Sequence, residues 1–344
     1  MKRIFLFSLF AVALAFALPL LLRPPGRGLA EGAAETPPAE TPVPSPAPAA
    51  APSPAPAAGP VLDAAVTLEV LTETGVERMT LADYLPLALA GEMPASFAPE
   101  ALKAQAVALR TYALRCKADR KAAHPEADVC GSSGCCAALA AEESLRAAWG
   151  ENYAAYAAKL AAAAAATDGQ YLVWDDAPAL TVFHAASAGR TEDGAALGVA
   201  APYLVSVDTP ETGEAVRGLV STVEVTAADF AAAVRSLLPE ADLTGPPEDW
   251  LGAAELDAAG RVRTLAVGGR SLSGLAARQL FSLRSTDFTV TYADGRFLFR
   301  VRGYGHGLGL SQYGADCMAD AGADYQEILA HYYPGTVLVM AVVE

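Results

Sequence analysis

One glutamate stands in a turn rich in glycine and proline, directly ahead of a strong helical pattern. The turn is Gly91-Glu92-Met93-Pro94, and the helix begins at Pro99, because proline fits the first helical turn and fixes φ there. A rigid element can aim a carboxylate on the loop before it, so Glu92 is the candidate for general acid and base chemistry. The same helix offers two cations, Lys103 and Arg110, to an anionic ligand.

A second group of residues has the types and spacing of a metal site. His124, Cys130, Cys135 and Cys136 fall within thirteen residues and are separated by the small-residue loop 131–134. Three thiolates and one imidazole suit a tetrahedral zinc ion, and a site with all four positions filled is structural rather than catalytic. The sequence therefore predicts structural zinc.

The same cysteines leave an oxidised alternative open. Exported proteins favour disulfides, for instance between Cys130 and Cys135, whereas the adjacent pair Cys135 and Cys136 could hardly bridge without strain. If zinc takes three of the five cysteines, Cys116 and Cys317 remain, and they either pair or sit apart as small buried residues.

A third constellation is the glycine-rich run 302–315. Its glycines alternate with side chains, which lets the backbone approach a ligand and places His306, Gln312 and Tyr313 as candidate substrate contacts. The spacing does not match a nucleotide-binding glycine loop. The alternative is that the glycines serve tight packing and that His306 is a hydrogen-bonded core residue.

A short patch from Phe183 to Thr191 ends a predicted strand in small and polar residues. Ser187 in this patch is a further candidate for substrate contact, together with the neighbouring His184. A lone histidine at a strand end is more often structural than functional, so this assignment is weaker than that of Glu92.

The elements that must position these residues are helices first and strands later, which predicts an α+β fold with a helical N-terminal part carrying the acid turn and an antiparallel β-rich part. Turns such as Ala293-Asp294-Gly295 between short strands indicate the antiparallel pairing. The predicted helices are 81–90, 99–121, 142–166, 227–238 and 275–283. The predicted strands are 170–174, 180–184, 203–207, 220–225, 261–267, 288–292 and 297–301.

Composition and charge exclude some classes of partner. The 344 residues include 24 basic and 39 acidic ones, for a net charge of -15, which repels nucleic acid and anionic lipid. An apolar content of 53% is ample for a core. An anionic ligand would have to be met by a few placed cations rather than by a basic surface.

The N-terminal region predicts export. Ile4–Leu22 is charge-free and long enough to cross a bilayer, so residues 1–22 are expected to form an uncleaved signal anchor. Residues 23–60 hold 12 of the 24 prolines and are expected to form a disordered linker, whose 38 residues could span on the order of 100 Å. Residues 61–344 are then the functional domain, held on the wall-facing side of the cell membrane.

Four motifs together resemble one known family. They are the stretch 92–112 with its Glu-Met-Pro turn and Arg-Thr-Tyr step, the patch His184-x-x-Ser187-x-Gly189-x-Thr191, the run 303–315, and His331-Tyr332-Tyr333-Pro334-Gly335-Thr336. In this order they resemble the stage II sporulation protein D family, also called the amidase-enhancer family. The similarity spans Val61 to Glu344.

The resemblance implies an activity and roles for matching residues. Such members are lytic transglycosylases that cut the β-1,4 bond between N-acetylmuramic acid and N-acetylglucosamine in peptidoglycan strands stripped of stem peptides, in septal wall remodelling and engulfment during sporulation. Glu92 matches the glutamate that serves as acid and base in these members, and Arg110 matches an arginine that their activity also needs. His124, Cys130 and Cys136 match a zinc motif in which Cys135 replaces the second histidine. Amidase and membrane-protein partners are implied as well.

The proposed chemistry also follows from the residues. A transglycosylase needs one carboxylate, which protonates the leaving oxygen and then takes the proton of the sugar's own 6-hydroxyl. Glu92 must therefore be protonated at neutral pH, which requires desolvation, and Arg110 is expected to meet the lactyl carboxylate of muramic acid. Two alternatives remain: a non-catalytic glycan-binding enhancer of a cell-wall amidase, and a peptidase with a cysteine near His306 or His184.

Overall fold

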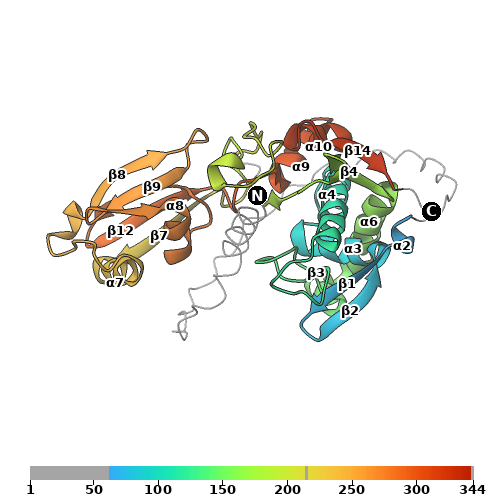
Figure 1. Ribbon diagram of the computed structural model, residues 1–344, viewed down its shortest axis with the longest axis horizontal. Coiled ribbons are helices and arrows are strands. Elements are labelled where there is room, and N and C mark those ends of the chain that lie inside the picture. Colours follow the sequence, from blue (N-terminus) through green and yellow to red (C-terminus); the bar gives the residue numbers. More distant parts are fainter. Residues whose placement is uncertain (1–61, 214–215, 342–344) are drawn as a thin grey trace, which may run out of the picture.

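The computed structural model describes residues 62–213 and 216–341, which form two lobes along the long axis of the molecule (Figure 1). The predicted anchor at 1–22 and linker at 23–60 lie outside the described residues. None of the described helices is both long enough and apolar enough to span a bilayer.

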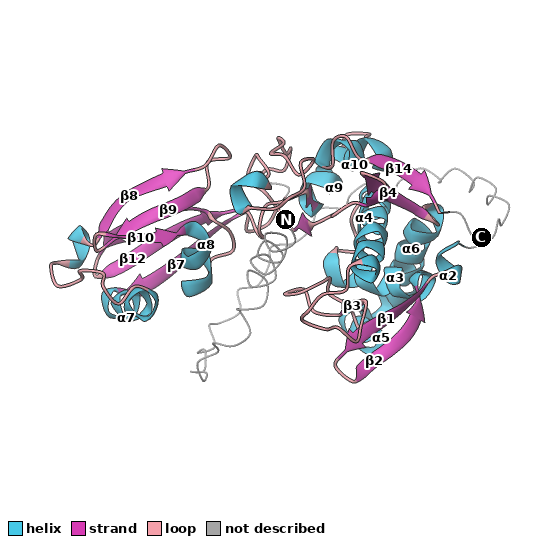
Figure 2. Cartoon of the chain, viewed as in Figure 1, coloured by secondary structure: helices cyan, strands magenta, loops and turns pink. Residues whose placement is uncertain are grey.

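The first lobe is mainly helical and contains both ends of the described chain (Figure 2). Its three small sheets have the strand orders β2-β1-β3, β14-β4-β5 and β13-β6. The elements are α2 (Leu62–Ala65), β1 (Thr67–Thr72), β2 (Gly75–Thr80), α3 (Leu81–Glu92), α4 (Pro99–Ala118), β3 (Val129–Cys130), α5 (Glu142–Trp149), η2 (Gly150–Asn152), α6 (Tyr153–Ala166), β4 (Gln170–Trp174), β5 (Ala177–Pro178), β6 (Phe183–His184), η3 (Ala195–Leu197), β13 (Leu310–Ser311), α9 (Gln312–Asp320), α10 (Tyr325–Tyr332) and β14 (Val337–Met340).

The second lobe is inserted between η3 and β13 and consists mainly of antiparallel strands (Figures 1 and 2). Its sheets, β10-β9-β8 and β11-β12-β7, enclose a separate hydrophobic cluster in which Phe230 stacks on Phe297 at 3.8 Å. The elements are β7 (Val220–Thr226), α7 (Ala227–Leu237), η4 (Pro247–Asp249), β8 (Leu251–Leu256), β9 (Val262–Val267), β10 (Arg270–Ser273), α8 (Gly274–Leu280), β11 (Asp287–Ala293) and β12 (Arg296–Arg302).

Helix α4 is the centre of the first lobe. Alanines at 104, 106 and 108 and the larger Leu102 and Leu109 are all fully buried, so the helix is covered on every side. Residues 104–113 are buried without interruption, and the small side chains among them let neighbouring elements approach closely. Helices α3, α6, α9 and α10 and strand β4 all pack on it.

A buried ion pair ties α4 to the rest of the lobe. The Arg110 guanidinium donates from Nε and Nη2 to the two carboxylate oxygens of Asp63, at 2.7 and 2.6 Å. The same guanidinium donates to the carbonyls of Ala164 and Gln170, at 3.2 and 3.0 Å. Arg110 and Asp63 are 1% and 3% exposed, so the charge is neutralised inside the protein. This pair fixes α2, the end of α6 and the start of β4 to the central helix.

The predicted α+β class is confirmed for the described residues, and several predicted bounds hold closely. Strand β4 coincides with the prediction, and the turn at Asp294 and Gly295, both with positive φ, joins β11 to β12 in an antiparallel hairpin. Two pairings, β1 with β3 and β13 with β6, are parallel instead. The prediction of one domain over 61–344 did not anticipate the second hydrophobic cluster.

Other expectations are corrected by the structure. Glu92 is the last residue of α3 and not part of a loop, because the helix continues two residues beyond the expected end at Ala90. The helix expected over 142–166 is broken at Gly150, which has φ of 52°. The strand expected at 203–207 is absent from the described chain, where its backbone makes loop hydrogen bonds. The strands that were not predicted are β1, β2, β3, β5, β8, β10, β13 and β14.

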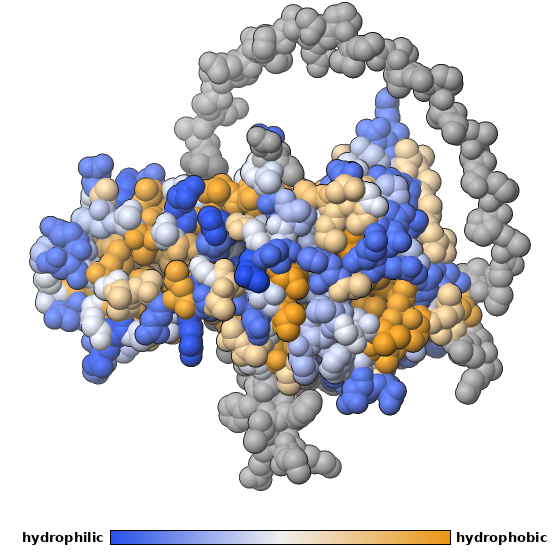
Figure 3. Space-filling view, turned by 90° about the horizontal axis from the view of Figure 1, so that it is seen from above, coloured by the Kyte–Doolittle hydropathy of each residue, from blue (hydrophilic) through white to orange (hydrophobic). Residues whose placement is uncertain are grey.

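The surface carries no extended apolar face on the side that Figure 3 shows. Hydrophobic residues there lie in separate areas among hydrophilic ones, over both lobes. Small separate apolar areas are normal on a protein surface and do not mark an interaction site. The candidate functional residues must therefore be located from the pockets and the buried polar groups.

The ion pair of Arg110 and Asp63 should contribute strongly to stability. Asp63→Ala leaves the guanidinium buried without a counter-charge, so we expect the free energy of unfolding to fall by about 3–5 kcal/mol. Urea denaturation followed by circular dichroism measures this change. The matched control is Glu142→Ala, which removes the exposed pair with Arg146 and should leave stability nearly unchanged because solvent screens that pair. Equal losses in both variants would contradict the assignment.

Candidate functional site

The two lobes meet at a pocket of about 280 Å³ that contains Glu92. Glu92 and Pro94 line it from the end of α3, and Gln312 and Tyr313 line it from the start of α9. The remaining lining residues come from the patch after β6, from the segments that enter and leave the second lobe, and from the loop between α8 and β11: Ala185, Ala186, Val216, Arg217, Gly218, Leu219, Arg284 and Tyr304.

A larger hollow of about 460 Å³ lies in the second lobe, between β8 and β11. None of the predicted site residues lines it. Its acidic residue, Asp287, is already paired with Arg302 at 3.0 Å. The smaller pocket, where the predicted acid is found, is therefore the candidate active site.

Helix α3 and a neighbouring loop together hold the Glu92 carboxylate. The backbone N–H of Ala138 donates to Glu92 Oε1 at 2.5 Å. Gly91 makes this approach possible, because a Cβ at that position would lie 2.5 Å from the Ala138 carbonyl oxygen. The carboxylate is thus fixed by a backbone that packs directly on the end of the helix.

The environment favours the protonated form of Glu92. Burial raises the pKa of its carboxyl group, while the Ala138 N–H and the nearby Gln312 side chain act in the opposite direction. Glu92 also lies at the C-terminal end of α3, where the helix dipole disfavours a negative charge. The desolvation expected from the sequence is therefore present.

The turn between α3 and α4 is attached to α9, which brings Glu92 and Tyr313 to the same pocket. Asp316 accepts a hydrogen bond from the Ala98 N–H at 2.7 Å, and the rings of Phe97 and Tyr313 meet edge to face at 4.8 Å. Helix α9 is capped by Ser311, whose hydroxyl accepts from the Gly314 N–H. Gln312 and Tyr313, both predicted as substrate contacts, are thereby placed beside Glu92.

Ser187 and His306 lie close to the pocket but are not among its lining residues. Because a carbonyl can only accept, His184 donates from Nδ1 to the Leu308 oxygen at 3.1 Å, and its Nε2 accepts the Ser187 hydroxyl at 2.6 Å. His306 Nδ1 accepts from the Leu308 N–H at 3.0 Å. Burial, followed by the charge of Arg278, lowers the pKa of His306 to about 3, so the ring is neutral.

Both predicted cations of α4 lie away from the pocket. Lys103 pairs with Glu100 at 2.6 Å on the same helix. Arg110 is buried against Asp63, as described above, so the structure does not place it where the expected contact with a lactyl carboxylate would form. Its position makes it a residue that holds the lobe together.

Three large polar side chains that line the pocket were not among the predicted site residues: Arg217, Arg284 and Tyr304. The net charge had indicated that an anionic ligand needs a few placed cations. It gave no way to choose among the arginines, since Arg217 and Arg284 belong to none of the motifs. Tyr304 is part of the glycine-rich run, where its exposure is now seen to be 52%.

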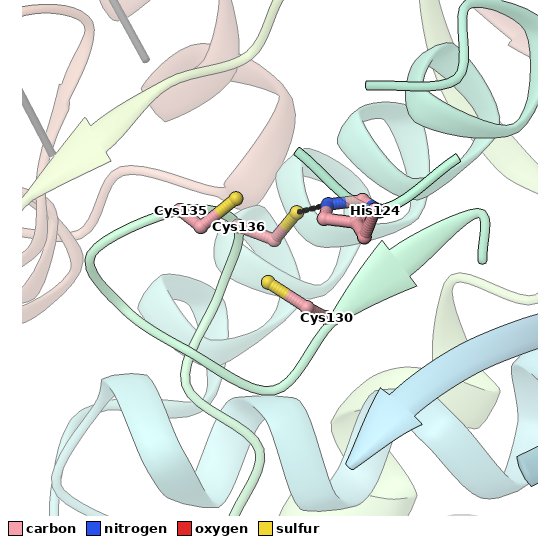
Figure 4. Close-up of side chains that lie close together, drawn as sticks. All are labelled: His124, Cys130, Cys135 and Cys136. Carbon is pink, nitrogen blue, oxygen red and sulfur yellow. Dashed lines mark hydrogen bonds between the residues drawn. The ribbon is translucent and has the colours of Figure 1, made fainter. Parts of the chain in front are cut away.

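The predicted metal ligands come together in one cluster (Figure 4). The ligand atoms of His124, Cys130, Cys135 and Cys136 lie within 4.8 Å of one another, and Cys136 Sγ lies 3.3 Å from His124 Nε2. All five cysteines are free, so neither the alternative bridge between Cys130 and Cys135 nor a pairing of Cys116 with Cys317 is present. The cluster can hold a metal ion.

The surroundings of the cluster suit that role. His124 Nδ1 donates to the Ala127 carbonyl at 3.1 Å, which leaves the lone pair of Nε2 directed at the cysteines. The backbone N–H groups of Cys135 and Cys136 both donate to the Ser132 carbonyl, which closes the loop around the site. The donor set is that of a soft tetrahedral ion. Two residues beyond Cys136, the same chain segment supplies Ala138 to Glu92.

Comparison with known proteins finds one group of relatives. A family model described as "Stage II sporulation protein" matches residues 71–174. The stage II sporulation protein D of Bacillus amyloliquefaciens is 32% identical over 263 residues, which are 76% of this chain and 74% of that protein. The protein of the same name from Bacillus subtilis strain 168 is also 32% identical, over 76% of this chain and 75% of its own length. The amidase enhancer of Bacillus subtilis is 40% identical over 78 residues, 23% of this chain and 11% of that protein.

Proposed function

Because the chain belongs to the stage II sporulation protein D family, whose members act in sporulation and on the cell wall, we propose that it is a peptidoglycan lytic transglycosylase. Its substrate is denuded glycan, and the bond cut is the β-1,4 bond between N-acetylmuramic acid and N-acetylglucosamine. The observation that carries the proposal is the pocket, where Glu92 is the only carboxylate among the described lining residues and has a raised pKa.

One carboxylate is enough for a transglycosylase, and Glu92 supplies it among the described lining residues. Glycoside hydrolases use two carboxyl groups, roughly 5 to 9.5 Å apart, one of which activates water or attacks the sugar itself. Here Glu92 protonates the leaving glycosidic oxygen, and its carboxylate then takes the proton of the muramoyl 6-hydroxyl. That oxygen attacks the same sugar's anomeric carbon, so a 1,6-anhydro ring closes and Glu92 is protonated again. Gln312 and Tyr313 can orient the sugar beside the acid.

The metal that the cluster would hold is proposed to be structural zinc. Three cysteines and one histidine fill a tetrahedral shell, so a bound ion has no open position for substrate or water. The ion would therefore take no part in the reaction. Bound by Cys130, Cys135 and Cys136 with the histidine, it would fix the loop that leads to Ala138, whose N–H contacts the Glu92 carboxylate.

The wall-facing location remains part of the proposal. The apolar stretch 4–22 and the linker at 23–60 would hold the domain on the extracytoplasmic side of the cell membrane, where septal glycan is the substrate during engulfment. Amidase and membrane-protein partners of an engulfment complex fit the same setting, because denuded glycan is produced when an amidase removes stem peptides.

A non-catalytic role is the alternative that a specific observation favours. The amidase enhancer matches this chain over 78 residues, and a protein of that name raises the activity of another enzyme. Such a binding module would bind denuded glycan through the same pocket and would not depend on the protonation of Glu92.

Glu92→Gln should abolish the formation of 1,6-anhydromuramoyl ends, because the amide can neither give nor take the proton. The fold should persist, since the amide oxygen can still accept from Ala138. Mass spectrometry of purified denuded glycan after incubation with the chain measures the products. Glu143→Gln, an exposed acid on α5, serves as the control and should keep full activity. If the Glu92→Gln chain is active, the proposed mechanism is wrong. If neither the wild-type chain nor its variants cleave the glycan, the enhancer alternative is favoured.

The rate should fall as pH rises through the raised pKa of Glu92. The carboxyl must begin protonated, and its raised pKa means that it keeps its proton to a higher pH than an exposed glutamate does. Above that pKa the ionised enzyme cannot protonate the leaving oxygen. Initial rates of anhydro-end formation across a pH series test this under saturating glycan. A rate that increases over the same interval would mean that Glu92 acts first as a base.

The purified chain should contain about one zinc ion. Structural zinc sites of this type bind with apparent free energies of about 10–16 kcal/mol, so Cys136→Ser should lose the metal and expose Cys130 and Cys135 to alkylation. Metal analysis and mass spectrometry of the alkylated protein measure both effects. Cys317→Ser, outside the cluster, should retain zinc. A zinc-free protein with Cys130 in a disulfide would contradict the assignment.

A further inference from the structure

Two arginines line the pocket from segments of the second lobe, whereas the acid is carried by the first. Arg284 lies in the loop between α8 and β11, and Arg217 lies just before β7, whereas Glu92 belongs to the first lobe. Both arginines are exposed. Among the described residues, no carboxylate lies within ion-pair distance of either guanidinium. Their positive charge is available to a ligand in the pocket.

Arg284 is held in place by its neighbours. Its Nη1 donates to the Gly218 carbonyl at 3.1 Å, and its guanidinium carbon lies 5.1 Å from the centre of the Tyr304 ring. Gly218 has φ of +78°, and a Cβ there would lie 3.1 Å from Arg284 Nη1. The guanidinium is thus placed between a carbonyl and an aromatic face, which reduces the entropy that it loses on binding. Its other N–H groups remain for a ligand.

The chemistry of the glycan supplies one matching group per disaccharide. The lactyl ether of N-acetylmuramic acid carries a carboxylate, whereas N-acetylglucosamine has none. A guanidinium binds a carboxylate through two parallel N–H···O bonds, which gives direction as well as energy. A carboxylate next to Glu92 would meet a like charge whenever Glu92 is ionised, so it is better placed against the arginines that the second lobe contributes.

We propose that Arg284, with Arg217 beside it, binds the lactyl carboxylate of the muramoyl residue whose glycosidic bond Glu92 protonates, and so selects muramic acid at the cleaved position. This inference rests on the proposed function. It transfers to the second lobe the role that the sequence had suggested for Arg110. It also gives the second lobe a purpose in the reaction, because the lobe brings the recognising cation to the acid of the first.

The test compares two glycans and two chains. Denuded glycan is used either as purified or after its carboxyl groups have been reduced to alcohols. Arg284→Ala should raise KM for denuded glycan about 10- to 100-fold with little change in kcat, which is the effect of one hydrogen bond to a charged group. With the reduced glycan, the wild-type chain and Arg284→Ala should have the same KM, because the interacting partner is missing.

Two further variants complete the comparison. Arg284→Lys keeps the charge without the paired N–H groups and should lie between the wild type and Arg284→Ala. Arg296→Ala, a surface arginine of β12 whose nearest carboxylate is that of Glu224 at 3.8 Å, is the matched control and should behave as the wild type. Thermal unfolding checks that Arg284→Ala is folded. If it is not, Arg284→Lys and Arg217→Ala are compared with the wild type in its place.

The outcomes separate this inference from the proposed function. Binding of both glycans is also measured in the Glu92→Gln chain, where no cleavage interferes. The Glu92→Gln chain should bind the glycan with carboxylates more tightly than the reduced glycan, and the double variant Glu92→Gln/Arg284→Ala should lose this preference. That result supports the inference even if the wild-type chain does not cleave glycan. If Arg284→Ala weakens binding of both glycans equally, or if the wild-type chain has the same KM for both, the inference is overturned. In either case, 1,6-anhydro products would still support the transglycosylase.

Discussion

The burial of one positive charge inside a helix of small apolar residues constrains the whole first lobe. Arg110 lies in the middle of α4, where water cannot solvate it, so Asp63 must reach it from α2 and carbonyls must reach it from α6 and β4. A buried charge whose partner is removed destabilises a protein far more than a surface charge does. One guanidinium therefore fixes α2, the end of α6 and the start of β4. Helix α4 in turn fixes the position of the turn that joins it to α3.

The polar contacts extend from this helix to the site. The turn before α4 is held by Asp316 of α9 and by Lys159 of α6, which donates to the Phe97 carbonyl at 2.5 Å. Helix α9 brings Gln312 and Tyr313 to the pocket, and the loop that carries the metal ligands brings Ala138 to Glu92. The carboxylate is therefore positioned by backbone contacts that depend on the whole lobe. Such positioning suits an acid that must act twice on the same substrate.

The sequence singled out Glu92, which the structure places in the pocket, the four residues of the His/Cys cluster and the α+β class, because each has a local signature. A proline at the first helical position, closely spaced cysteines and alternating strands are all readable within a few residues. It could not show which arginines line the pocket. Arg110 stands in a recognisable motif but is buried, and Arg284 stands in none but reaches the pocket, since exposure depends on elements distant in the chain. The hairpin of β1 and β2 was missed although Thr67–Thr72 and Gly75–Thr80 are separated by only two residues.

The division of charge between the lobes resolves a conflict in the proposed chemistry. An anionic substrate requires a cation, yet a cation in contact with Glu92 would stabilise its carboxylate and lower the pKa that the reaction needs raised. Arg217 and Arg284 line the same pocket, but neither contributes to the pKa shift of Glu92, which is set by burial, Ala138 and Gln312. The recognising charge can thus act on the substrate without ionising the acid, as long as the two lobes keep the two groups apart. Arg110, to which the sequence had assigned the contact with the lactyl carboxylate, is instead buried against Asp63 in the first lobe, so the proposed recognition falls to the cations of the second lobe.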